Sequence, residues 1–351
     1  MVELNVLLSF LWAFVVTVFA IPSITYVAHV KNLLDEPDHR RVHASLTPRL
    51  GGLAIFAGVM SSLTIFGDMT PQIQRVVAAG LIVFFIGLKD DIIPISAFKK
   101  FFVQILATGI VMFLGEVKID NFQGIFGMNE LPYGLSYGFT FLVIVGLTNA
   151  INLIDGLDGL AGTMILIASV TFGVYFYQTN GNIFHPYATV AFCLAGAIIG
   201  FLRYNLKKAI IFMGDTGSLV CGLLLSVMAI QFVQMRPFPG APVVAIAVLI
   251  VPIYDTVRVF TMRILSGKSP FSPDKNHIHH VLMELGLSQL GVVFSLAAVN
   301  ISIIFLVRQL TFLGNNVLLG SLGISMLLIS IILEILLVRK RNRKRTAAAI
   351  E

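Results

Sequence analysis

Hydrophobic residues in this chain occur in long runs that are separated by short polar segments. A helix of about 20 residues crosses the hydrocarbon core of a bilayer, and most of these runs approach that length once flanking residues are included. The approximate bounds of the eleven candidate spans are residues 4–28, 51–67, 73–89, 101–115, 136–153, 160–177, 187–202, 217–234, 242–260, 290–307 and 316–338. The pattern therefore predicts an all-α, polytopic integral membrane protein with about eleven transmembrane helices, or ten if one run does not cross.

The composition agrees with this pattern. Of the 351 residues, 57% are hydrophobic and only 12% are charged, which is far more apolar than an average soluble domain. No soluble second domain and no repeat is visible, so residues 1–351 are predicted to form a single integral membrane domain that ends in a basic tail at residues 339–351. Cys193 and Cys221 lie inside apolar runs without His or Cys neighbours at metal spacing, which favours neither a disulfide nor a zinc site.

The distribution of positive charge predicts the orientation of the spans. If the N-terminus is outside, all 24 Lys and Arg fall on the inner side except Arg75, Lys118, Arg236 and Arg308. By the positive-inside rule, the N-terminus is then outside and the C-terminus is cytoplasmic. The net charge of +6 therefore reflects membrane topology rather than affinity for nucleic acid, and the basic tail would face anionic lipid headgroups.

The segment NAINLIDGLDGLAG at residues 149–162 places two amides and two carboxylates at one end of an apolar run. Asp155 and Asp158 are three residues apart and share a face of a helical turn, and Asn149 and Asn152 repeat this spacing one turn earlier. Ionisable residues at a membrane helix end indicate a functional site. The alternative is a helix-breaking turn in which these side chains only cap the flanking helices.

Two further polar groups end or begin predicted spans. Asp90 and Asp91 end the third span, and adjacent carboxylates repel each other unless a cation or a shared proton relieves them. Magnesium is the expected cation because it prefers oxygen ligands and commonly bridges substrate phosphates. The alternative is two solvated carboxylates at a helix end.

The run FMGDTGS at residues 212–218 begins the eighth span. Its glycines and free backbone N–H groups would form an anion site at a helix N-terminus. Asp215 conflicts with bound anions unless a metal ion lies beside it, which again predicts a cation shared with phosphate. A plain Asp or Thr N-cap is the alternative, and Asn205, in the basic loop upstream, is not informative alone.

The longest inner loop, at about residues 261–289, contains SPFSPDKNHIHH. The histidines could donate to phosphate oxygens or transfer protons near neutral pH, and Arg263 and Lys275 could hold a diphosphate. A zinc site would need further ligands, and an amphipathic surface segment is the structural alternative.

The first inner loop ends in TPRLGG before the second span, and it contributes His43 and Arg49 as candidate phosphate contacts. Membrane topology alone would also place basic residues there. All these polar clusters fall on the same side of the predicted topology, and this convergence predicts an active site on the cytoplasmic face.

Taken together, Asp90-Asp91, residues 149–162, GDTGS at 214–218 and HIHH at 277–280 resemble the polyprenyl-phosphate N-acetylhexosamine-1-phosphate transferase family. The resemblance runs from about Asp35 to Met283, with four blocks in the right order at helix ends. Residues 270–280 look most like the bacterial undecaprenyl-phosphate GlcNAc-1-phosphate transferases that start O-antigen, common-antigen or teichoic-acid synthesis. The phospho-MurNAc-pentapeptide translocase branch usually has three consecutive histidines, which Ile278 interrupts here, so that branch is the alternative.

The resemblance implies a magnesium-dependent glycosyl-1-phosphate transferase of the inner (cytoplasmic) membrane, with manganese as an alternative metal. It implies that Asp215 is the chief metal ligand and Asn152 the second, and that a lysine near the phosphates corresponds to Lys100 or its neighbour Lys99. The implied catalytic residues are Asp90, Asp91, His277, His279 and His280. The implied nucleotide- or substrate-binding residues are Asp155, Asp158, Asn205, Arg263, Lys100, Asn149, Arg49 and His43.

In the implied reaction, an oxygen of undecaprenyl phosphate attacks the β-phosphorus of UDP-GlcNAc and expels UMP, in one step or through an aspartyl-phosphate. Membrane lipids are the other expected partners, nucleic acid is not expected, and a homodimer is left open. A secondary transporter is the rival from another class. Transporter sites lie near the bilayer midplane between repeats, whereas these clusters lie at one face and no repeat is evident.

Overall fold

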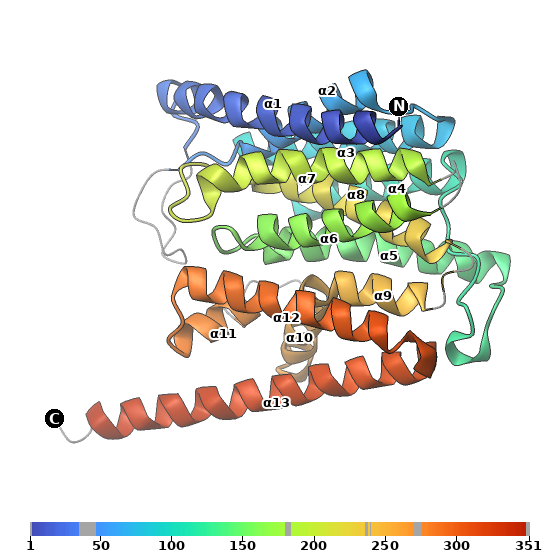
Figure 1. Ribbon diagram of the computed structural model, residues 1–351. Helices are drawn as coiled ribbons and strands as arrows, with labels where there is room; N and C mark the ends of the chain where they lie inside the picture. Colours follow the sequence, from blue (N-terminus) through green and yellow to red (C-terminus); the bar gives the residue numbers. More distant parts are fainter. Residues whose placement is uncertain are drawn as a thin grey trace.

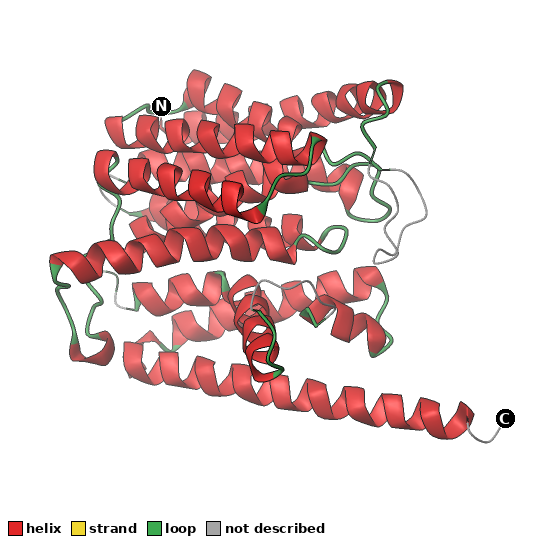
Figure 2. Ribbon diagram, turned by 180° about the vertical axis from the view of Figure 1, so that it is seen from behind, coloured by secondary structure: helices red, strands yellow, loops and turns green. Residues whose placement is uncertain are grey.

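The structure is a computed structural model that describes residues 2–34, 47–179, 184–235, 238, 240–269 and 276–348. The described chain is a bundle of helices (Figures 1 and 2), and its one β-bridge joins Asn121 to Glu130. The helices are α1 (Val2–Val30), α2 (Gly51–Phe66), α3 (Pro71–Ile92), α4 (Ala97–Gly109), α5 (Tyr133–Ile154), α6 (Leu160–Gln178), α7 (His185–Asn205), α8 (Gly214–Val233), α9 (Ala241–Val248), α10 (Ile250–Leu265), α11 (Ile278–Glu284), α12 (Gln289–Gln309) and α13 (Asn315–Ala348), with short turns η1 (Ile110–Leu114), η2 (Ile125–Gly127) and η3 (Thr311–Leu313).

The predicted all-α membrane fold is confirmed. Within the described residues, nine helices are long and apolar enough to cross a membrane, and the bent pair α9 and α10 would make a tenth span. Together with the shorter apolar helix α2, these correspond one by one to the eleven hydrophobic runs. The two termini lie at opposite ends of the bundle (Figure 1), as an odd number of spans requires. Which terminus faces the cytoplasm stays a prediction.

Helix α8 forms the centre of the fold. It is buried along almost its whole length, and it contacts α2, α3, α5, α6, α7 and α9. Small residues permit this packing, since interhelical contact in membranes depends on close backbone approach. A Cβ on Gly222 would lie 2.7 Å from the Cα of Thr148 in α5, and a Cβ on Gly52 would lie 2.1 Å from the backbone N of Gly217. The close contacts fix the N-terminal turn of α8 against its neighbours.

The ninth predicted span is broken into α9 and α10, which meet at an angle of 75°. Pro252 lies in the first turn of α10, where its missing N–H costs little. The buried side chain of Asn300 in α12 donates to the carbonyls of Ala247 and Val248, at 3.0 and 3.4 Å. These bonds satisfy backbone groups that the break would otherwise leave unpaired in an apolar environment. As a result, α10 runs across the direction of the other helices (Figure 1).

Helix α13 borders the bundle and is the longest helix, with 34 residues. Its first turn holds the hairpin that precedes α5, because Asn315 and Asn316 donate to the carbonyls of Gln123 and Gly124. The helix continues to Ala348, so the predicted basic tail extends α13 rather than forming a separate segment over its described part.

Candidate active site

The polar motifs meet where helices α3, α4, α5 and α8 begin or end. Asp90 lies in the last turn of α3, Lys100 in the first turn of α4, and Asp215 in the first turn of α8. The ammonium of Lys100 bridges the two carboxylates, at 2.9 Å from Asp90 Oδ2 and 2.7 Å from Asp215 Oδ2. All three side chains are largely buried, with 14 to 25% of their surface exposed. The cluster therefore combines two carboxylates and one ammonium at a largely buried position.

Asn152 extends this cluster from the last turn of α5. Its Nδ2 donates to Asp215 Oδ1 at 3.1 Å and to Ser218 Oγ at 2.8 Å. The sequence-based pairing of Asp215 with Asn152 thus corresponds to a direct contact. Lys100, rather than Lys99, is the lysine that reaches the carboxylates.

The donor set of this cluster fits a magnesium ion. Asp215, Asp90 and the amide of Asn152 offer hard oxygen atoms, and magnesium takes one or two protein carboxylates and completes its shell with water and phosphate oxygens. In the described part of the chain, no three His, Cys, Asp or Glu side chains are grouped to hold a metal by themselves. A cation here would therefore depend on amide and substrate oxygens.

Asp91 has a different environment from Asp90, although the two are adjacent. Its Oδ1 accepts from the backbone N of Asp215 at 2.7 Å, and its Oδ2 accepts from the backbone N and the hydroxyl of Thr216 at 2.9 and 2.5 Å. These bonds occupy both carboxylate oxygens at the N-terminus of α8, where a negative charge is favourable. Asp91 thus anchors the helix start that carries Asp215, a role that its sequence-based assignment as a catalytic residue did not anticipate.

The loop before α2 is joined to the same helix start. The backbone N of Gly51 and Gly52 donate to the carbonyls of Phe212 and Met213, at 2.9 and 2.8 Å, and Phe212 N donates to Pro48 O at 2.8 Å. The carbonyl oxygen of Arg49 lies 2.2 Å from the position of a Cβ on Gly214, whose φ is +72°. The structure therefore brings Arg49 next to the cluster.

The turn between α5 and α6 contains Asp155 and Asp158. Asp158 is 7% exposed and accepts from the backbone N of Ala209 at 3.3 Å. Asn205 holds the turn from α7, because its Oδ1 accepts from Gly159 N at 2.7 Å and its Nδ2 donates to Ile211 O at 2.9 Å. Gly159 has φ of +79°, which favours glycine. These hydrogen bonds fix the conformation of the turn. Nucleotide contact by Asp155, Asp158 and Asn205 stays a prediction.

Asn149 takes part in a contact inside the bundle. Its Nδ2 donates to Gln104 Oε1 at 2.8 Å and to Val145 O at 2.8 Å. Gln104 lies in α4, one turn after Lys100, so the pair joins α4 to α5 below the cluster. This side-chain pairing accounts for Asn149 structurally, and substrate contact by Asn149 stays a prediction.

The histidine run lies at the start of α11 and packs on α10. His277 Nδ1 lies 2.7 Å from Asp255 Oδ2. The rings of His277 and His279 are stacked at 5.6 Å, and those of His279 and His280 are 4.3 Å apart. His279 is 1% exposed, and burial together with the neighbouring His280 lowers its pKa to about 3.

His279 links the histidine run to the turn of residues 155–159. A Cβ on Gly156 would lie 2.9 Å from His279 Nε2, so the absence of a side chain at position 156 makes room for the imidazole. Arg263 is buried near the end of α10. His43 and Lys275 lie outside the described residues.

Sequence reasoning missed Asp255 and Arg258, which are both buried on α10. Arg258 donates to the carbonyl of Asn276, directly before His277. The sequence did contain an indication of their role. Asp255 and Arg258 lie three residues apart inside a predicted span, and ionisable side chains there cost free energy unless they have a function. Asp255 lay outside the helix-end motifs and was assigned only to a hydrophobic run, and Arg258 was counted only among the positive charges on the inner side.

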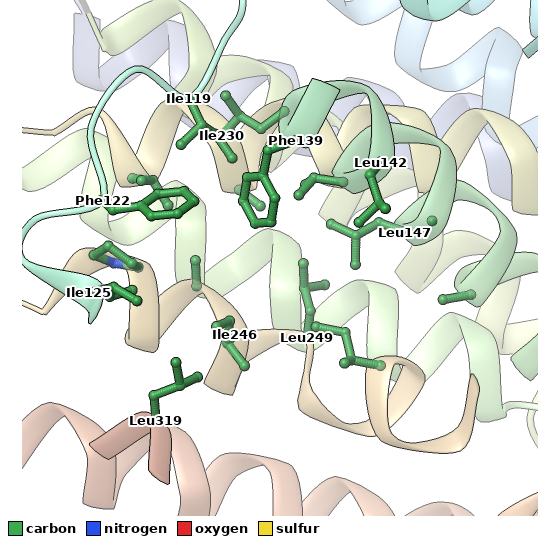
Figure 3. A pocket seen from close by; sticks show the side chains of 18 of the residues that line it. Ile119, Phe122, Ile125, Phe139, Leu142, Leu147, Ile230, Ile246, Leu249 and Leu319 are labelled. Atoms are coloured by element: carbon green, nitrogen blue, oxygen red, sulfur yellow. The ribbon is translucent and has the colours of Figure 1, made fainter. Parts of the chain in front are cut away.

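An apolar cavity of about 420 Å³ lies between α5, α8, α9 and α10 and extends to η2 (Figure 3). Apart from Thr256, all its lining residues are apolar, among them Phe139, Leu142 and Leu249. Ala150, which also lines it, is two residues from Asn152. Along α5, the cavity lining therefore ends two residues before Asn152, which contacts Asp215.

The helical membrane bundle and its cluster of carboxylates, amide and lysine define a multi-pass membrane protein with a site suited to phosphate chemistry. A model of the glycosyl transferase family 4 matches residues 73–233. A Bacillus subtilis protein named "Probable undecaprenyl-phosphate N-acetylglucosaminyl 1-phosphate transferase" is 34% identical over 307 residues, which cover 84% of this chain and 85% of the relative.

Two other relatives have related names. The undecaprenyl-phosphate alpha-N-acetylglucosaminyl 1-phosphate transferase of Yersinia pestis is 31% identical, covering 84% of this chain and 82% of that protein. The decaprenyl-phosphate N-acetylglucosaminephosphotransferase of Mycobacterium tuberculosis is 32% identical, covering 81% of this chain and 77% of that protein. The chain therefore belongs to the polyprenyl-phosphate N-acetylhexosamine-1-phosphate transferase family, and it is a glycosyl-1-phosphate transferase.

Proposed function

We propose that this protein transfers GlcNAc-1-phosphate from UDP-GlcNAc to undecaprenyl phosphate, and that the products are undecaprenyl-diphospho-GlcNAc and UMP. The observation that carries the proposal is the Asp90–Lys100–Asp215 cluster, which Asn152 contacts from α5, the helix that also lines an apolar cavity up to Ala150. A lipid phosphate needs both environments at once. The names of the Bacillus and Yersinia relatives, which specify undecaprenyl phosphate and N-acetylglucosaminyl 1-phosphate, support the choice of substrates.

The polyprenyl chain would occupy the apolar cavity of Figure 3, with its phosphate directed toward Asn152 and Asp90. Because a polyprenyl chain already lies in hydrocarbon, its binding in the cavity would depend on close van der Waals packing rather than on removal of apolar surface from water. A cavity with an apolar lining would bind the lipid chain without specific polar contacts. The end of the cavity would determine where the lipid phosphate lies.

In the proposed reaction, an oxygen of the lipid phosphate attacks the β-phosphorus of UDP-GlcNAc. A phosphorus–oxygen bond forms there as the bond from that phosphorus to the bridging oxygen breaks, and UMP leaves with the bridging oxygen. Lys100 would offset charge on the diphosphate, and Asp90 would keep the lipid phosphate deprotonated and oriented. Asp155 and Asp158 would hold the nucleotide.

We assign the metal to Asp215 and Asn152, the two residues that the resemblance implied as ligands and that contact each other in the structure. Bound there, magnesium would neutralise negative charge on the diphosphate. Lys100 would then exchange one carboxylate contact for a contact with a phosphate oxygen. The reason is that a carboxylate oxygen that binds the metal cannot also hold the ammonium.

The product would be the first lipid-linked sugar of an O-antigen, a common antigen or a teichoic acid, made at the cytoplasmic face of the inner membrane. The alternative donor is UDP-MurNAc-pentapeptide, as in the translocase branch of the family. The interruption of the histidines by Ile278 favours the GlcNAc reaction.

The test is release of UMP by the purified protein with magnesium, undecaprenyl phosphate and a panel of UDP-sugars. We expect UDP-GlcNAc to give lipid-dependent UMP, and UDP-MurNAc-pentapeptide to give none. Release from the pentapeptide donor alone would establish the alternative, and no lipid-dependent release from any donor would contradict the proposal.

A further inference from the structure

Asp255 is a buried carboxylate in the middle of α10, with 1% of its surface exposed. Both of its oxygens contact the histidine run. Oδ2 lies 2.7 Å from His277 Nδ1, and Oδ1 accepts from the backbone N of Ile278 at 2.6 Å. Burying a charge is costly unless it is paired and hydrogen-bonded, so the two donors explain how this carboxylate is tolerated.

The neighbouring Arg258 supports the same segment. It lies one turn after Asp255 on α10 and donates to the carbonyl of Asn276. Asp255 and Arg258 therefore hold the backbone on both sides of His277, through the N–H that follows it and the carbonyl that precedes it. Two ionisable residues of one helix thus position a three-residue segment.

The contact with Asp255 defines the protonation pattern of the imidazole. An ionised carboxylate only accepts hydrogen bonds, so the proton of a neutral His277 must be on Nδ1, and Nε2 keeps its lone pair. An asparagine could not reproduce this arrangement, since its NH₂ group would face either the Nδ1–H or the N–H of Ile278. The position therefore requires a carboxylate rather than any polar residue.

We propose that Asp255 is a positioning residue that holds His277 with Nδ1 protonated and Nε2 available, next to the turn of residues 155–159. That turn is adjacent because His279 packs against Gly156. Nε2 accepts a hydrogen bond from a hydroxyl or amide N–H of the sugar, and it donates to a phosphate oxygen once the ring takes up a proton. The contribution to catalysis rests on the proposed function, whereas the protonation pattern of His277 does not.

The kinetic test uses Asp255→Asn, Asp255→Glu, His277→Ala and the double variant Asp255→Asn/His277→Ala. We expect Asp255→Asn to lower kcat by about 10- to 100-fold, because His277 loses the carboxylate that fixes its ring orientation and tautomer, with a smaller change in the KM for UDP-GlcNAc. Asp255→Glu should restore part of the rate. In the His277→Ala background, Asp255→Asn should cause no further loss, because Asp255 acts through His277. Independent, additive losses would overturn the proposal.

Tyr254→Phe is the matched control. Tyr254 precedes Asp255 on α10, and its hydroxyl pairs with Ser330 of α13 at 2.8 Å, away from the histidine run. This variant removes a hydrogen bond from the same helix, and we expect its kcat to match that of the wild type. A loss equal to that of Asp255→Asn would mean that α10 is generally sensitive, which would contradict the specific role.

A second measurement does not depend on activity. Nitrogen NMR of the wild-type protein with ¹⁵N-labelled histidine reports which ring nitrogen carries the proton, and His277→Gln identifies the signal. We expect a neutral His277 to be protonated at Nδ1. A proton on Nε2 would overturn this inference even if UMP is released, and a proton on Nδ1 would support it even if no UDP-sugar is a substrate.

Discussion

The carboxylate cluster and the histidine run are the two parts of the proposed site, and they are built in different ways. The cluster joins residues from the ends of α3, α4, α5 and α8, and Lys100 connects it directly to Asp90 and Asp215. The histidine run follows a broken span and is held by Asp255 and Arg258 from within α10. In the first part, helix ends present the carboxylates and the lysine. In the second, a helix interior supports a loop.

This difference indicates a division of roles. The cluster contains the charges that suit metal and phosphate, and its geometry depends on tight packing around α8. The histidine run contains neutral or weakly basic groups, and its geometry depends on two buried polar anchors. We therefore expect substitutions in the cluster to affect the transfer step most strongly and substitutions near the histidines to have smaller effects.

The largest effect is expected for Asp215→Asn. It removes a charge from the cluster that pairs with Lys100 and is the proposed chief metal ligand, so a loss of several kcal/mol of charge stabilisation, or about 10³-fold or more in kcat, should follow. Its size is nearly unchanged, so the protein should still insert and show a near-normal melting temperature. Near-normal UMP release at ordinary magnesium concentration would show that the ligand assignment is wrong.

Asp90→Ala and Asp91→Ala form a matched pair that separates chemistry from folding. Asp90→Ala should lower kcat by about 10²-fold, as loss of a positioned acid–base group does. Asp91→Ala removes three hydrogen bonds from the start of α8, and it should reduce the free energy of unfolding by about 1–3 kcal/mol.

Melting temperatures and kcat of the two variants, measured in the same detergent, provide the comparison. Asp91→Ala should melt at the lower temperature and retain the larger share of kcat. The opposite order in both quantities would return the catalytic role to Asp91, as the sequence alone had allowed.

A smaller effect concerns the pH dependence of stability. The folded protein lowers the pKa of His279 to about 3, against an ordinary value of about 6.5. Below pH 6.5 the unfolded chain takes up a proton that the folded chain does not, so the contribution of His279 is fully present above pH 6.5 and is lost as the pH falls toward 3. The slope is at most about 1.4 kcal/mol per pH unit.

Thermal melting of the wild type and of His279→Gln between pH 7 and pH 5 tests this linkage. The wild type should lose more stability over this interval than the variant. Equal losses would show that His279 is not responsible.

The smallest effect is expected for Glu284→Gln. Glu284 in α11 accepts two hydrogen bonds from Arg341 in α13, at 2.7 and 2.8 Å, but the side chains are 39% and 54% exposed. Exposed ion pairs contribute about 0–1 kcal/mol, so melting temperature and kcat should change little. A loss as large as that of Asp255→Asn would mean that α13, rather than α10, holds the histidine run.

Much of the fold and the cluster could be predicted from sequence because both depend on local patterns. Each hydrophobic run specifies a helix, and Asp90, Asn152 and Asp215 lie at the ends of such runs, where the alternating direction of the spans brings them to one side. The contact of Asn152 with Asp215 follows from that alternation.

The remaining features depend on tertiary contacts between distant residues. The separate roles of Asp90 and Asp91 follow from the packing of α3 on α8. This packing cannot be read from two adjacent carboxylates in the sequence. The break at Leu249 depends on Asn300, about fifty residues later. Asp255 was hidden because its partner, His277, lies beyond the end of the helix.

The most direct test of this division is single-turnover transfer by Asp215→Asn and Asp255→Asn, with UDP-GlcNAc and undecaprenyl phosphate both saturating and magnesium present. Mass spectrometry of the lipid fraction measures undecaprenyl-diphospho-GlcNAc. We predict no detectable product within the wild-type turnover time for Asp215→Asn, and slower but measurable product for Asp255→Asn. Normal product formation by Asp215→Asn, or a complete loss confined to Asp255→Asn, would contradict the account.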